Sequence, residues 1–162
     1  MRALVALSNA IDRACRVGAA VSLALMVLLI AIQVIARYVF SEPPGWTEEG
    51  ARYAMVWSGL LGATVAFKAG ADPVLIKLVR LEGSAAIAWL RAATVVLFLG
   101  PILYFCVFGP GQDIARGFLA RSASRNSEAI GLSMVWFTAA LPVALVAILI
   151  HVAASLAARR NP

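Results

Sequence analysis

The feature that most constrains this chain is an apolar run near its N-terminus, from Val17 to Ala36. Within this run only Ser22 and Gln33 carry clearly polar side chains. At ~1.5 Å per residue, a helix of this length matches the ~30 Å hydrocarbon core of a bilayer. The run follows a basic start, as a signal peptide does, but it exceeds the ~7–15 apolar residues of a cleaved signal. We therefore expect a retained membrane-spanning helix.

Three later apolar runs predict an all-α integral membrane protein with a single membrane domain over 1–162. The expected spans are about 17–36, 51–67, 92–108 and 130–150. Composition agrees with lipid as the solvent, because 62% of the residues are hydrophobic and only 14% are charged. A soluble domain carries about 25% charged residues. The chain is therefore expected to cross the membrane four times.

The Lys and Arg residues predict the orientation of these spans. The N-terminus, the second loop and the C-terminus carry most of the 14 cations, so the positive-inside bias places both termini in the cytoplasm. In the second loop, apolar residues alternate with Lys77, Arg80 and Glu82, which favours an amphipathic helix in the membrane interface over about 73–89. Nucleic-acid binding is excluded, because the cations sit singly or in pairs rather than on one face.

The segment after the first span holds the most informative polar and aromatic residues. Pro43-Pro44-Gly45 enforces a turn. Thr47 is then a candidate N-cap, and Glu48 and Glu49 would meet the positive end of the helix dipole. Paired carboxylates at a membrane entrance are also typical of cation or proton handling, but adjacent helical residues point about 100° apart, which favours capping or partner contact. The candidate contact residues are Arg37, Tyr38, Trp46, Thr47, Glu48, Glu49, Arg52 and Trp57.

A stripe of small residues recurs every four positions along the second span. Such a stripe lets another backbone approach closely, as in small-xxx-small packing of membrane helices. The partner is either another helix of this chain or another protein. The stripe consists of Gly50, Ala54, Ser58, Gly62, Ala66 and Gly70.

Two prolines, Pro101 and Pro142, fall inside expected spans, where each removes one helical hydrogen bond. Broken helices form binding sites in transporters, but proline is also tolerated in ordinary spans. We interpret both residues as kinks that shape their helices.

Groups for chemistry are sparse in this sequence. No Asp, Glu or Lys lies deep within an apolar run, and there is no Walker loop, HExxH or GxSxG motif. Cys15, Cys106 and the single His151 match no zinc or haem pattern. We therefore expect neither an enzyme nor a bound metal or cofactor.

The motifs between Arg37 and Gly70, followed by those between Ser127 and Pro142, occur in an order that resembles the small permease subunit of TRAP transporters (tripartite ATP-independent periplasmic, DctQ type). One departure is that the family commonly shows Gly-x-His-Ile after the second helix, whereas this chain reads Gly70-Ala71-Asp72-Pro73, so no role of that histidine is carried over. The segments that carry the resemblance are Arg37-Tyr38-Val39-Phe40, Trp46-Thr47-Glu48-Glu49, Ala51-Arg52-Tyr53, Trp57, Gly62-Ala63, Ser127 to Leu132, Trp136 and Leu141-Pro142.

The resemblance implies a three-part secondary transporter in the bacterial inner membrane. A periplasmic substrate-binding protein would capture an organic acid, and a large TRAP permease subunit would hold the substrate and sodium sites. The small subunit would widen the static scaffold against which the large one moves, in contact with membrane lipids. Two alternatives stay open: a membrane assembly factor, and an autonomous small four-helix exporter, although the first span lacks the embedded carboxylate of such exporters.

Overall fold

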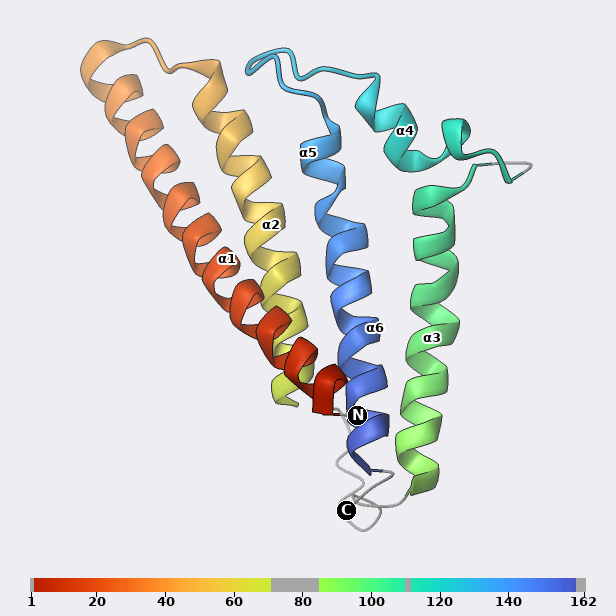
Figure 1. Ribbon diagram of the computed structural model, residues 1–162. Helices are drawn as coiled ribbons and strands as arrows, with labels where there is room; N and C mark the ends of the chain where they lie inside the picture. The colour runs from red at the N-terminus through yellow and green to blue at the C-terminus, as the bar shows by residue number, and fades with distance from the viewer. Residues whose placement is uncertain (1, 71–84, 110–111, 160–162) are drawn as a thin grey trace.

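The computed structural model describes residues 2–70, 85–109 and 112–159, and all regular elements in these ranges are helices. The predicted interfacial helix over 73–89 lies mostly outside the described residues, and its last part, 85–89, forms the start of a long helix. The α-helices are α1 (Arg2–Ile35), α2 (Gly45–Ala69), α3 (Ala85–Val107), α4 (Phe118–Ala123), α5 (Val135–Thr138) and α6 (Ala140–Arg159), as Figure 1 shows.

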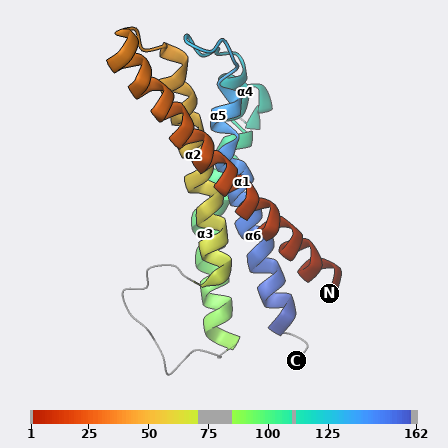
Figure 2. The ribbon, with the colours of Figure 1, turned by 90° about the vertical axis from the view of Figure 1, so that its left-hand side faces the viewer.

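The four long helices form an open bundle. Helices α1 and α2 pack along one another, both contact α6, and α3 packs against α6. Figure 2 shows α1 crossing α2 and α6 obliquely. The start of α1, the end of α2, the start of α3 and the end of α6 lie together, and we call this the terminal end of the bundle (Figure 1). The opposite end, with the 36–44 connection and the 108–134 segment, is called the loop end.

Proline and glycine fix the limits of α2. A π-helical turn, Ala36–Phe40, extends α1, and Ser41 then adopts a left-handed φ of 58°. Pro44, extended at φ −67° and ψ 127°, caps the start of α2. The prediction that Thr47 is the N-cap is therefore wrong: its Oγ1 donates to the Pro44 carbonyl at 2.6 Å from inside the first turn. Gly70, at φ 66°, ends α2 and bonds its N–H to the Ala66 and Phe67 carbonyls.

The bundle is packed mainly through small side chains. Several alanines on α6 are buried, among them Ala140, Ala144 and Ala147. A Cβ on Gly18 of α1 would lie 2.9 Å from Leu61 Cδ1 of α2, so this glycine lets the two helices approach. Close backbone approach is the usual way in which membrane helices gain packing contacts. The small-residue packing seen here thus involves α1 and α6 as well as the stripe on α2.

Within the part of the chain that the structure describes, three helical segments are long and apolar enough to cross a membrane: Arg2–Phe40, Ala88–Val107 and Val135–Ala158. They make the chain a multi-pass membrane protein. The remaining predicted span, 51–67, lies within α2, which has 25 residues but is not one of these three. The count of four spans therefore stays a prediction.

The two mid-span prolines occupy different settings. Pro101 lies inside α3, which continues past it to Val107. Pro142 lies in the first turn of α6, just after the interruption at Ala139 that separates α6 from α5. Pro142 has no N–H, so it cannot donate the helical hydrogen bond to the carbonyl of Thr138, the last residue of α5.

Candidate functional site at the loop end of the bundle

The candidate site is built where the first turns of α2 meet the 124–134 segment. That segment is a turn held by its own backbone: Asn126 and Ser133 form an isolated bridge, and Ser127 N–H donates to the Leu132 carbonyl at 2.8 Å. Gly131 supplies the left-handed residue at φ 72°. The predicted fourth span, from about 130, therefore begins as a helix only at Val135.

Glu49 joins α2 to this turn. Its Oε2 accepts the Ala129 N–H at 3.2 Å, and its Oε1 accepts the Tyr53 hydroxyl at 3.4 Å. A hydrogen bond with the Ser127 side chain is the largest of the effects that hold the pKa of Glu49 below its usual value, while burial opposes them. Arg52 adds a favourable charge. Glu49 is thus a contact residue within this chain.

Trp57 makes a second connection, two turns further along α2. Its indole Nε1–H donates to the Trp136 carbonyl in α5 at 2.8 Å. The ring also packs on a small core of Cys15, Leu61 and Ala147, contributed by α1, α2 and α6. Trp57 therefore links three helices with the start of the last apolar segment.

Of the other residues in the predicted contact set, Thr47 is fully buried in the first turn of α2, and the remaining five are exposed. Glu48 pairs with Arg52 one turn along α2 at 2.9 Å, and both side chains are largely exposed. Tyr38 is 80% exposed and Trp46 is 47% exposed. Arg37 is exposed beside Tyr38 on the π-helical turn. These five side chains lie on the surface of the loop end, where a partner can reach them.

A groove of about 660 Å³ separates α2 from the 125–129 part of the turn. Its lining mixes both signs of charge, with Glu48, Glu49 and Arg52 on one side and Arg125 and Glu128 on the other. Among the residues that the structure describes, no group of three or more His, Cys, Asp or Glu is placed to hold a metal ion.

The predicted small-residue stripe divides along α2. Ala54 is buried, and a Cβ on Gly50 would lie 3.1 Å from Leu29 Cδ1 of α1. No atom lies within 4 Å of a Cβ built on Gly62. Ser58 and Ala66 are half-buried, and Gly70 is exposed at the end of the helix. The stripe therefore packs within the chain at the loop end, is open at the Cβ positions of Gly62 and Gly70, and is half-buried at Ala66 between them.

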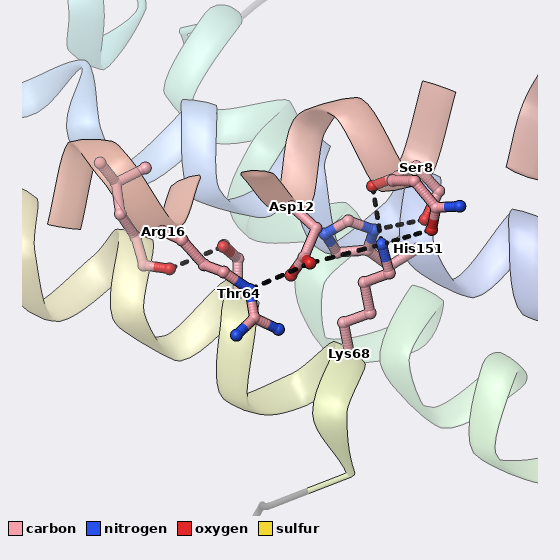
Figure 3. Close-up of polar contacts among 8 residues, drawn as sticks. Ser8, Asp12, Arg16, Thr64, Lys68 and His151 are labelled. Atoms are coloured by element: carbon pink, nitrogen blue, oxygen red, sulfur yellow. Dashed lines mark hydrogen bonds and ion pairs between the residues drawn. The ribbon is translucent and has the colours of Figure 1, made fainter. Parts of the chain in front are cut away.

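Sequence reasoning missed a polar cluster at the terminal end, which Figure 3 shows in close-up. Lys68 of α2 donates to the Ser8 carbonyl at 3.0 Å and to Asn9 Oδ1 at 2.9 Å, both on α1. Asp12 pairs with Arg16 at 3.1 Å and lies 3.7 Å from Lys68 Nζ. The only sign of this cluster in the sequence is the i, i+4 spacing of Asp12 and Arg16, because Lys68 served only as evidence for the orientation of the spans.

His151 of α6 belongs to the same cluster. It is 4% exposed, and its Nδ1 shares a hydrogen bond of 2.8 Å with the Ser8 hydroxyl. The two residues are 143 positions apart, so no local pattern reveals the contact. The cluster thus joins α1, α2 and α6 at the terminal end, while Glu49 joins α2 to the turn at the loop end and Trp57 joins the middle of α2 to α5.

Comparison with known proteins gives this geometry its context. The family model described as "Tripartite ATP-independent periplasmic transporters, DctQ component" matches residues 26–161. A protein of Haemophilus influenzae, provisionally named a TRAP transporter small permease protein, is 38% identical over 61 residues. That match covers 38% of this chain and 38% of the relative. No solved structure matches. The family match spans most of the chain, including α2 and the 127–136 segment that Glu49 and Trp57 contact. The chain therefore belongs to the DctQ family of TRAP transporter small permease components.

Proposed function

We propose that this chain is the small membrane subunit of a sodium-coupled, binding-protein-dependent secondary transporter for organic acids, and that it acts as a scaffold for the large permease. Family membership supports the assignment to this transport system. In the proposal the chain spans the bacterial inner membrane four times, with the terminal end in the cytoplasm and the loop end in the periplasm. The sodium and substrate sites lie in the large permease, and the binding protein meets the loop end.

The observation that carries the scaffold role is that α2 is fixed at both of its ends. At the loop end, Glu49 accepts the Ala129 N–H at 3.2 Å, and at the middle of α2 Trp57 donates to the Trp136 carbonyl at 2.8 Å. At the terminal end, Lys68 makes two hydrogen bonds of 3.0 and 2.9 Å to α1. A scaffold has to keep its shape while its partner moves, and contacts between distant segments at both ends of one helix favour a rigid body.

Open surface along the helices supports a role for a membrane partner. On α3, Leu97 and Phe98 are 70% and 66% exposed. Apolar side chains in a bilayer face lipid or a neighbouring helix, and small residues mark the places of closest approach. Gly62 is such a place, because nothing lies within 4 Å of its Cβ position. We expect Gly62→Leu to reduce co-purification of the large permease without changing the thermal unfolding of the chain on its own.

An internal disulfide tests the scaffold role directly. A Cβ on Gly45 would lie 3.8 Å from Ala129 Cβ, within the ~3.5–4.5 Å that a disulfide requires. The double variant Gly45→Cys, Ala129→Cys would thus lock α2 to the turn. Reconstituted with the large permease and the binding protein, it is expected to support sodium-driven uptake of a labelled carboxylate equally well when oxidised and when reduced. The single variant Gly45→Cys controls for the substitution itself.

Three results would contradict parts of this proposal. Loss of uptake on oxidation, restored by a reductant, would show that the small subunit moves during transport. Full uptake by the large permease without this chain would show that no scaffold is needed. Uptake that proceeds without a sodium gradient would refute the sodium coupling.

A further inference from the structure

A pocket of about 300 Å³ opens at the terminal end, between α1, α2, α3 and α6. Its walls are largely apolar and include Val5, Ala92 and Val152, while Lys68, Arg91 and His151 supply polar groups. This volume is at the lower end of the ~300–1,000 Å³ typical of small-ligand sites. The combination of apolar walls with cations at the end of a helical bundle matches an amphiphilic ligand with an anionic head.

The charged side chains that line this pocket are cations. Two cations line it, and none of the described lining residues carries a carboxylate. The Lys68 ammonium donates to two neutral acceptors on α1, the Ser8 carbonyl and Asn9 Oδ1, and it also lies 3.7 Å from the Asp12 carboxylate, which offsets part of its charge. The Arg91 guanidinium lies 5.0 Å from the centre of the Phe67 ring, a distance typical of a cation–π contact.

His151 supplies an independent observation. Its side chain is 4% exposed and lines the pocket, and Nε2 has no hydrogen-bond partner among the described residues. A buried polar atom without a partner is unfavourable, so such atoms are rare. If the Ser8 hydroxyl donates to Nδ1, then Nε2 carries the ring proton and is itself a donor. An anionic oxygen in the pocket would satisfy it.

We propose that this pocket binds the phosphate headgroup of an anionic phospholipid, with Lys68 and Arg91 as the charge partners and His151 as a hydrogen-bond partner. Basic pockets between membrane helices bind such headgroups. A lipid fits better than free phosphate, because most of the lining is apolar and the lining helices α1, α3 and α6 each belong to a candidate membrane span. The acyl chains would leave along the apolar walls. The inference does not depend on the identity of the transporter.

The test uses the full chain, purified in mild detergent, with thermal unfolding and native mass spectrometry as readouts. Phosphatidylglycerol is added as the anionic probe, phosphatidylcholine as the zwitterionic control, and inorganic phosphate as the soluble source. We expect phosphatidylglycerol alone to raise the unfolding midpoint and to remain bound in the gas phase. A ligand that binds only the folded state raises stability with its concentration, which makes the midpoint a measure of binding.

Substitutions then locate the site. A cation near a membrane surface contributes about 1 kcal/mol to anionic-lipid binding, so Arg91→Gln is expected to weaken phosphatidylglycerol binding about fivefold. Lys68→Gln is expected to do the same, and Arg91→Gln keeps the test valid if loss of the α1 contacts unfolds the Lys68 variant. The matched control is Arg116→Gln, whose side chain is 73% exposed at the loop end and whose substitution should leave binding unchanged.

The following outcomes would overturn the inference. Equal stabilisation by phosphatidylcholine would show that no headgroup charge is recognised. Stabilisation by inorganic phosphate to the same extent would assign the pocket to a soluble anion rather than a lipid. Binding that survives Arg91→Gln unchanged, or that falls equally in Arg116→Gln, would place the lipid elsewhere on the chain. None of these results bears on whether the large permease co-purifies, so the two proposals fail separately.

Discussion

Replacing Trp57 by Phe removes the hydrogen bond that joins α2 to α5 and keeps an aromatic ring at the same place. The lost bond, from Nε1 to the Trp136 carbonyl, measures 2.8 Å. A net hydrogen bond contributes about 0.5–1.5 kcal/mol, and the smaller ring also loses packing on the Cys15 and Leu61 core. We therefore expect Trp57→Phe to lower the free energy of unfolding by about 1–2 kcal/mol. For a chain of this size that corresponds to about 2–8 °C in the unfolding midpoint.

The two cysteines make the assay direct. Cys15 and Cys106 are free and only 6% and 4% exposed, so a thiol-reactive dye reports their exposure as the protein unfolds. The matched control is Trp46→Phe, because Trp46 is 47% exposed and the same substitution there should shift the midpoint by less than about 1 °C. Equal midpoints for the two variants would refute the argument that the Trp57 bond fixes α2 to the last apolar segment.

Three further predictions concern the packing and the charges of the bundle. Gly18→Leu would push against Leu61, whose Cδ1 lies 2.9 Å from the new Cβ, and should destabilise the chain by about 1–3 kcal/mol in the same dye assay. Glu49 has a lowered pKa, so its contribution to stability is present above the ordinary value of about 4.3 and is lost as the pH falls through the folded value. The unfolding midpoint should fall on acidification below about pH 5, and Glu49→Gln should flatten that dependence. Glu48→Gln breaks an exposed ion pair with Arg52 and should change stability by less than about 1 kcal/mol in a denaturant titration.

Hydropathy located the apolar segments but could not give the helix limits. The first span was predicted over 17–36, and the helix actually begins at Arg2, because charged residues continue a helix as readily as apolar ones once it forms. Residues 130–134 were predicted as the start of a span, yet they belong to the turn closed by the Asn126–Ser133 bridge. A short apolar run does not distinguish a turn from a helix when the deciding contact lies elsewhere in the chain.

The sequence predicted some residues of the candidate site but not their partners, because those partners are distant in the chain. The sequence singled out Glu49 and Trp57, and capping or partner contact was the favoured role for Glu49. Its actual partner is Ala129, 80 residues away, and Trp57 bonds to a residue 79 positions away. Periodicity and capping rules describe neighbours along one helix, so they cannot supply contacts of this range. The link between Ser8 and His151 was missed on the same ground.

The central claim is that this chain works as one subunit of a larger transporter. Its most direct test is a pull-down of the tagged full chain from mild detergent, after expression from its native gene neighbourhood, with mass spectrometry of the proteins that accompany it. The account predicts a large multi-span permease in amounts equal to the chain, and less of it with Gly62→Leu. Recovery of the chain alone, or only as a homo-oligomer, would contradict the subunit assignment and favour an autonomous small exporter.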